Sequence, residues 1–237
     1  MKFYDLHVHS SFSGGESSVE QLAEVAHLLG YRGFCFSAHY EGDSRVKKIQ
    51  SDIERARSKF PVEIYLGLEA RERKDVERLR QIRRRFDILL VRGGDLEMNR
   101  LAVETPEVDI LTHPELNRND TGLNDTLLRM AAKNNVAIEI NFREILNSSR
   151  STRAKILRNV SQNVIMARKV KAPVVVCSGA LSHYEMKDPM VLVSLANVLG
   201  LEMKDAKAAL SSVPEAGLKE SAERKDDRWV MPGVREV

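Results

Sequence analysis

The chain is poor in the residues that mark several specialised protein classes. Its 237 residues include only two cysteines, one tryptophan and 5% aromatic residues in total. Two cysteines cannot form the disulfide framework of a small secreted scaffold. Cys35 and Cys177 both lie in apolar runs, where reduced core thiols are the expected state. These scarcities favour a protein of a reducing compartment.

Long apolar runs and a dominant sign of charge are also missing. The longest strongly apolar region, Met190–Leu201, is too short and too interrupted to cross a bilayer. The chain begins directly in a strand-like run, which predicts no signal peptide. The net charge of +3 is too small to identify a nucleic-acid binder, so the local distribution of charge must decide. We expect a soluble, cytoplasmic protein without a membrane partner.

Seven β-rich runs alternate with helical stretches, and this alternation predicts the fold. Strands are expected at Lys2–Val8, Gly33–Ala38, Val62–Leu68, Asp87–Val91, Val108–Thr112, Val136–Asn141 and Pro173–Ser178. Helices are expected at Ser18–Leu29, Ser44–Lys59, Lys74–Arg85, Leu96–Glu104, Leu123–Asn134, Ser151–Lys171, Asp188–Leu199 and Lys204–Ser212. Such alternation predicts a parallel α/β sheet with right-handed crossovers. Seven units favour a closed, distorted TIM-like (β/α)7 barrel, and an open doubly wound sheet is the alternative.

The composition changes near the end of the chain. Residues 1–218 read as a single barrel domain, whereas residues 219–237 form a charged C-terminal tail. Trp229, the only tryptophan, is followed by Val230, Met231 and Pro232. We expect this apolar group either to fold back onto the barrel or to contact a partner.

A His-x-His pair ends the first predicted strand. Side chains two apart in a strand share a face, so His7 and His9 can reach one cation. Asp5 lies on the same face and could orient one imidazole as a hydrogen-bond acceptor. The alternative is two solvated histidines at the end of a strand.

Polar residues also end the other strands, and in a barrel these ends face one mouth. His39 follows the second strand, Glu69 the third, and His113 with Glu115 the fifth. Glu139, Asn141 and Arg143 end the sixth, and Ser178 ends the seventh. Histidine and carboxylate are the usual ligands for Zn, Mn or Fe. The predicted metal ligands are His7, His9, His39, Glu69 and His113.

These strand ends resemble successive motifs of the PHP (polymerase and histidinol phosphatase) domain. The resemblance rests on the segments Asp5–Ser10, Ser37–His39, Gly67–Glu69 and Leu111–Glu115. It implies a (β/α)7 barrel with a trinuclear phosphoesterase centre. The chain departs from that pattern in having Ser13-Gly14-Gly15, Arg92 after the fourth strand, and Ser178-Gly179-Ala180 in place of Asp-x-His. These departures leave a vestigial site for one divalent ion, Zn, Mn or Fe.

The second half of the chain resembles the ribonuclease P protein component 3 family, the archaeal relatives of the eukaryotic thirty-kilodalton ribonuclease P subunit. The resemblance is carried by Glu139–Leu146, Ser148–Asn159, Val174–Ala180 and the apolar region from Asp188 onward. It implies a PHP-related barrel with a decayed metal site. It also implies a role beside ribonuclease P RNA, precursor tRNA, ribonuclease P protein component 2 and other holoenzyme subunits. The RNA would carry the chemistry with Mg, and the protein would need no cofactor.

A local excess of positive charge agrees with that reading. Between residues 143 and 171 eight basic residues stand against one acid, Glu144. Arg150 and Arg153 flank the start of a predicted helix, whose free N–H groups suit a phosphate. The predicted RNA contacts are Arg143, Arg150, Arg153, Lys155 and Arg158, with Asn141 and Ser178 lining the same mouth. The scarcity of aromatic residues favours recognition of backbone and shape over reading of single bases.

The sequence therefore predicts a non-catalytic protein subunit of ribonuclease P, which assists the RNA in cleaving the 5′ leader from precursor tRNA. Two alternatives stay open. One is a metal-dependent PHP-type phosphoesterase with a partial metal site. The other is a PHP-derived scaffold that binds neither RNA nor metal.

Overall fold

All seven predicted strands are present and pair in parallel in chain order. The structure is a computed structural model that describes residues 1–231 and 234–235. The strands are β1 (Tyr4–His9), β2 (Gly33–Ala38), β3 (Glu63–Ala70), β4 (Ile88–Arg92), β5 (Ile110–Thr112), β6 (Ala137–Asn141) and β7 (Val174–Cys177). Curled into a nearly closed barrel, they confirm the predicted fold class, and the open sheet is excluded.

The seam between β7 and β1 is closed by hydrogen bonds that follow the last strand. The N–H of Gly179 donates to His7 O at 3.0 Å, and the N–H of His9 donates to Ala180 O at 2.7 Å. The fully buried Asp5 carboxylate accepts the N–H of Ser178 at 3.2 Å, across the same seam. The barrel thus closes through the turn after β7 rather than through a seventh strand pairing.

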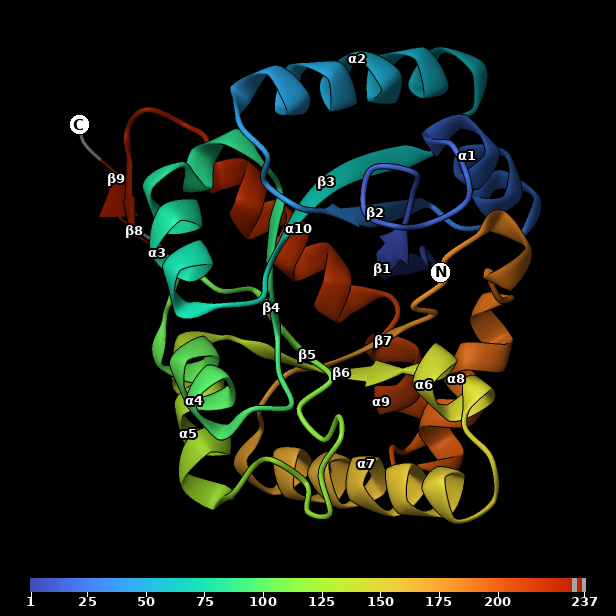
Figure 1. Ribbon diagram of the computed structural model, residues 1–237, viewed down its shortest axis with the longest axis vertical. Helices are drawn as coiled ribbons and strands as arrows, with labels where there is room; N and C mark the ends of the chain where they lie inside the picture. Colours follow the sequence, from blue (N-terminus) through green and yellow to red (C-terminus); the bar gives the residue numbers. More distant parts are fainter. Residues whose placement is uncertain (232–233, 236–237) are drawn as a thin grey trace.

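Helices cover the outside of the barrel, so that α2 and α7 lie on opposite sides of the strands (Figure 1). The outer helices are α1 (Val19–Leu28), α2 (Asp43–Lys59), α3 (Arg73–Gln81), α4 (Leu96–Glu104), α5 (Asp125–Asn134), α7 (Arg150–Val170), α8 (Pro189–Val198) and α9 (Met203–Ala208). Ser18 caps α1 as predicted, since its Oγ accepts the N–H of Gln21 at 3.2 Å. None of the helices among the described residues is long and apolar enough to span a bilayer.

Several elements were not predicted. They are α6 (Phe142–Asn147), α10 (Ser212–Arg224), the 3-10 turns η1 (Arg83–Arg85) and η2 (His183–Glu185), and the hairpin of β8 (Trp229–Met231) and β9 (Val234–Arg235). The change of composition at residue 219 falls inside α10, because the buried face of this helix is short and interrupted by charges. Trp229 folds back, with the Arg224 guanidinium 5.7 Å from its ring centre. Pro232 lies outside the described residues.

The barrel interior is a separate apolar core that α10 closes from below. Leu218 of α10 packs with Tyr4, Leu6, Ile88 and Val175 inside the strands. The larger core lies between the outer face of the strands and the surrounding helices. With its interior filled from the amino-terminal end of the strands, the barrel has polar side chains only at the opposite mouth.

A buried ion network fixes α10 to the strands. Asp109 accepts Arg83 of η1 and Arg224 of α10, whose Nη1 lies 3.3 Å from Oδ1, and both arginines are at most 5% exposed. Removing the shared carboxylate leaves two buried cations without their common partner.

We expect Asp109→Ala to lower the free energy of unfolding by about 3–5 kcal/mol, measured by urea titration. The matched control is Glu104→Ala, which removes the exposed partner of Arg100 and should cost about 1 kcal/mol or less. Equal losses in the two variants would contradict a structural role for the buried network.

Candidate functional site

A polar cavity of about 410 Å³ lies at the carboxyl ends of the strands. Its lining includes His9 of β1, His39 after β2, Arg92 of β4, His113 after β5 and Asn141 of β6. Arg71, Arg143, Glu144 and Gly179 complete the polar part of the wall. Residues far apart in the sequence therefore meet at one mouth, as the strand ends predicted.

His7 lies beneath this cavity and is held by Glu139. The two side chains are fully buried, with His7 Nδ1 2.6 Å from Glu139 Oε1. Burial works against the charged imidazole, but attraction to Glu139, Glu69 and Asp5 outweighs it and raises the pKa of His7. Despite its burial, Glu139 has its pKa lowered to about 2 by His7 and His113. The pair is therefore an ion pair at neutral pH.

Asp5 does not orient the imidazole, contrary to the expectation from the strand pattern. Its carboxylate instead accepts the backbone N–H groups of His7 at 3.3 Å and of Ser178. A register shift between Asp5 and Val8 interrupts the β1–β2 pairing here, so strict alternation fails at this point. Burial raises the pKa of Asp5 to about 6, and its bonds with Ser178 and His7 oppose that shift.

Of the five predicted metal ligands, the structure groups two with one residue that was not predicted. His7, His113 and Glu139 have ligand atoms within 4.8 Å of one another, the one such group among the described residues. His7 Nε2, His113 Nδ1 and Glu139 Oε2 are buried without a hydrogen-bond partner there. Orphaned buried donors and acceptors of this kind fit one divalent ion, for which these three residues are the ligand set.

The other predicted ligands are held by different partners. Glu69 is fully buried and accepts Arg71 Nε at 2.8 Å, while His39 Nδ1 is 3.9 Å from it. His9 Nδ1 lies 3.0 Å from Ser37 Oγ and 3.2 Å from Ser13 Oγ. Burial and the neighbouring His7 lower the pKa of His9 to about 3. The five residues therefore do not converge on one point, and a multinuclear centre does not fit.

The turn after β7 has no ligand to offer. Ser178 and Ala180 are buried, and Ser178 Oγ accepts the N–H of Ala180 at 3.2 Å. Gly179 has φ +64°, and a Cβ there would stand 2.5 Å from Asn141 Oδ1. Asn141 in turn donates to Glu139 Oε1 at 3.1 Å and accepts the N–H of Glu144. Asn141 and Ser178 thus build the mouth, and Ser178 is not among its lining residues.

The predicted RNA-binding side chains occupy different environments. The Arg153 guanidinium donates to backbone carbonyls at the end of α6, reaching Ile145 O at 3.1 Å and Leu146 O at 3.0 Å. Lys155 Nζ donates to Asn119 Oδ1 at 2.8 Å, and Arg158 Nη2 donates to Asn119 O at 3.1 Å. These three side chains support local structure in addition to carrying charge.

Arg150 and Arg143 complete that set. Arg150 is exposed at the start of α7 and has φ +49°. Arg143 lines the mouth cavity and lies 3.4 Å from Glu185 Oε2. Arg150 is therefore a solvent-facing cation, whereas Arg143 belongs to the mouth.

The chain matches the family model described as RNase P subunit p30 over residues 2–226. It belongs to the RNase P subunit p30 family. Ribonuclease P protein component 3 of Methanosarcina mazei is 36% identical over 98% of this chain and 95% of its own length. The same component of Methanothermobacter thermautotrophicus is 32% identical over 99% and 95%, respectively. The family predicted from the sequence is confirmed.

Solved structures agree with this assignment. A chain of the cryo-EM structure of archaeal ribonuclease P with mature tRNA has a TM-score of 0.84 and 27% identity, covering 99% of this chain and 97% of that one. N-isopropylammelide isopropylaminohydrolase of Burkholderia multivorans has a TM-score of 0.63 at 12% identity, covering 91% and 74%. The second likeness concerns the fold alone.

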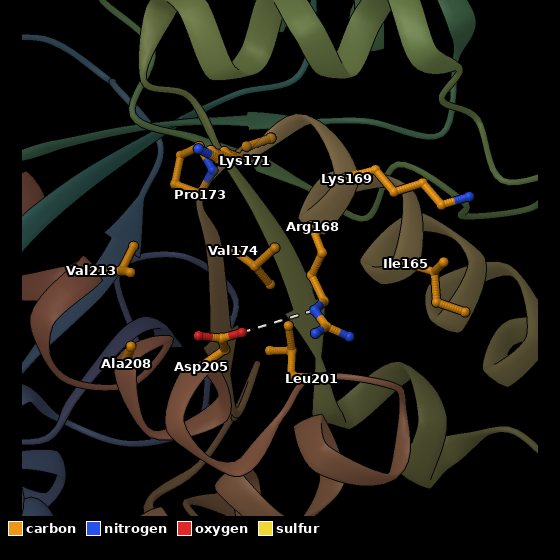
Figure 2. A pocket seen from close by; sticks show the side chains of 11 residues that line it. Ile165, Arg168, Lys169, Lys171, Pro173, Val174, Leu201, Asp205, Ala208 and Val213 are labelled. Carbon is orange, nitrogen blue, oxygen red and sulfur yellow. Dashed lines mark ion pairs between the residues drawn. The ribbon is translucent and has the colours of Figure 1, made fainter.

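The basic residues of this p30-family chain do not form one cluster. α7 has 21 residues and is therefore about 31 Å long, so Arg150 and Lys171 stand at opposite ends of it. A cavity of about 590 Å³ lies at its far end, between α7, β7 and α9. Figure 2 shows Arg168 there, pointing toward Asp205. Basic residues at a helix C-terminus have an ordinary explanation in the helix dipole, so this cavity is not our candidate site.

Sequence reasoning missed Glu139 as the partner of His7, and Arg71 and Arg92 as lining residues of the mouth. The place of Glu139 in a strand of alternating residues was a usable signal, since Asn141 on the same face ends that strand. Arg92 was visible as a departure from the PHP pattern. Its meaning needed the neighbouring Glu69, which comes from another strand.

Glu115, beside the mouth, gives a pH-dependent prediction. Burial raises the pKa of its carboxyl from 4.5 to about 8, and Oε2 has no hydrogen-bond partner among the described residues. Because the folded state holds the proton more tightly, stability is full below pH 4.5 and falls as pH rises toward 8. A neutral isostere should remove this loss.

We expect Glu115→Gln to be close to wild type in stability at pH 5. At pH 8 it should be more stable, with a gain roughly 3 kcal/mol larger than at pH 5, at about 1.4 kcal/mol per pKa unit. Urea unfolding at both pH values measures the difference. The exposed Glu24→Gln is the control, and a gain that does not change with pH would argue against a buried neutral Glu115.

Proposed function

We propose that this p30-family chain is a protein subunit of ribonuclease P that assists the catalytic RNA in removing the 5′ leader from precursor tRNA. The observation that carries the proposal is the match, over nearly the whole chain, to ribonuclease P protein component 3 and to a chain of archaeal ribonuclease P with mature tRNA. Its partners are then ribonuclease P RNA, precursor tRNA, component 2 and the other protein subunits. Mg²⁺ serves the RNA of the holoenzyme.

The proposed place of work is the cytoplasm. Cys35 and Cys177 are buried as free thiols, and burial raises the pKa of both well above the ordinary range. Neutral buried thiols fit a reducing compartment, where no disulfide is required for stability.

We place the RNA contact at the amino-terminal end of α7. Its first turn contains no acidic residue, and the Ser149 side chain makes no capping hydrogen bond. Free N–H groups, the positive end of the helix dipole and the exposed Arg150 then favour a phosphate. Lys155 and Arg158 add charge while they hold the loop at Asn119. Such contacts position a protein on RNA without reading its sequence.

The subunit role is tested by reconstitution. The holoenzyme is assembled from the cognate RNA and the other protein subunits, with and without this chain, and precursor-tRNA cleavage is measured at low Mg²⁺. Addition should raise the cleavage rate. An assembly that is unaffected by leaving the chain out would refute the subunit role.

Arg150→Glu separates RNA contact from folding. Since the side chain is exposed, the variant should keep the wild-type stability but bind the RNA more weakly. Its plot of log affinity against log salt should be shallower by roughly one phosphate contact, about 0.7–0.9 in slope. The control is Arg55→Glu on α2, another exposed arginine. Similar losses of affinity in both variants would show a general effect of charge.

A metal-dependent phosphoesterase is the second candidate, and the cluster of His7, Glu139 and His113 favours it. These residues would hold one divalent ion, which when bound would polarise a phosphate ester. The arginine on Glu69 limits the set to three protein ligands.

We expect dialysed protein loaded with Zn²⁺ or Mn²⁺ to retain at most one ion per chain, and Glu139→Gln to lose it. Elemental analysis measures the stoichiometry, and a phosphomonoester assay measures turnover. The subunit proposal expects no turnover dependent on His7; turnover that vanishes in His7→Ala would instead support the phosphoesterase. Glu24→Gln is the control for nonspecific metal binding.

A further inference from the structure

Three guanidinium groups border the mouth cavity, and they come from three different parts of the chain. Arg71 follows β3, Arg92 ends β4, and Arg143 lies in α6. Their side chains are 48%, 34% and 30% exposed, so each guanidinium is anchored in the wall and still open to the cavity. A rim of arginines is an unusual border for a cation site, because it repels positive charge.

Two of these arginines have unused donors. Arg71 is committed to Glu69 at 2.8 Å. Arg92 reaches Glu69 only at 3.9 Å, and Arg143 lies 3.4 Å from Glu185 and 4.0 Å from Glu144. Neither guanidinium donates a hydrogen bond to a side chain or carbonyl within residues 1–231 and 234–235. Each guanidinium has five N–H donors in a planar fork that suits phosphate oxygens.

A buried imidazole faces the same space. His113 lines the cavity and is 4% exposed, and its Nδ1 has no hydrogen-bond partner among the described residues. A buried polar atom left without a partner costs free energy, which a ligand in the cavity would recover. This orphaned atom is independent of the arginines and points to the same ligand position.

The acids around the cavity decide what charge it can hold. Glu69 is buried against Arg71, and Glu139 is paired with His7 beneath the cavity. Glu144 and Glu185 are 23% and 38% exposed and approach Arg143 only at 3.4–4.0 Å. These two carboxylates reach solvent and can move from Arg143, whereas Glu69 cannot. The cavity therefore suits a single negative charge rather than a multiply charged anion.

We propose that the barrel mouth binds a phosphate group, held by Arg92, Arg143 and His113, where a PHP-type barrel would hold metal ions. The chemistry fits a phosphodiester or terminal phosphate of RNA and equally an inorganic phosphate ion. This site rests on the proposed function only for the choice of RNA as the source of the phosphate. It is separate from the contact proposed at Arg150, on the outer edge of α7.

The test uses the full chain alone, without ribonuclease P RNA, so that its failure leaves the subunit proposal intact. Isothermal titration with inorganic phosphate, in chloride buffer with EDTA, should detect one site per chain. Arg92→Gln and Arg143→Gln should each weaken binding roughly 10- to 100-fold. Arg92→Lys keeps the charge but loses the fork, so it should bind with intermediate affinity. Arg55→Gln is the matched control, and thermal unfolding verifies that each variant is folded.

A second arm replaces phosphate by a short 5′-phosphorylated RNA oligonucleotide and by its unphosphorylated form. Tighter binding of RNA that depends on Arg92 identifies an RNA phosphate as the ligand. Binding of inorganic phosphate alone, with the same dependence, identifies a free phosphate site. Binding that needs added metal, that is equal in Arg92→Gln and Arg55→Gln, or that is absent for every probe would overturn the proposal.

Discussion

The buried contact between His7 and Glu139 is the interaction on which the mouth of the barrel depends. It joins β1 to β6 at 2.6 Å in a place where neither charge could exist alone. Asn141 braces Glu139, the turn at Gly179 packs on Asn141, and that turn closes the seam to β1. One ion pair therefore connects the chemistry of the strand ends to the closure of the fold.

The mouth combines an inherited arrangement with a changed charge. His7, His113 and Glu139 still form a cluster that could hold one ion. Glu69, however, is bound by Arg71, and Arg92 and Arg143 border the cavity. Introducing guanidinium groups lowers the affinity for several cations and raises it for an anion, because the same low-dielectric wall strengthens both effects. A barrel related to metal-dependent phosphoesterases can thus keep contact with phosphate after losing its catalytic metals.

The surface proposed for RNA lies apart from this mouth. At the start of α7 only Arg150 is free of structural duties, since Arg153 caps α6 while Lys155 and Arg158 hold the Asn119 loop. Substitutions at these four arginine and lysine positions are therefore not equivalent. An effect on RNA binding at Arg153 would mix lost charge with a disturbed helix end, whereas Arg150 reports charge alone.

The sequence by itself determined the barrel, its seven strands and the family, because alternating apolar runs and strand-end motifs are local signals read over most of the chain. It also located the histidines of the mouth. Only the tertiary structure decided that Glu139 serves His7, that Arg71 occupies Glu69, and that the basic residues of α7 lie at two ends of a long helix. It likewise decided that α10 continues through the charged segment to close the barrel. These outcomes depend on contacts between residues distant in sequence, and such contacts are set by packing and charge pairing after the chain has closed on itself.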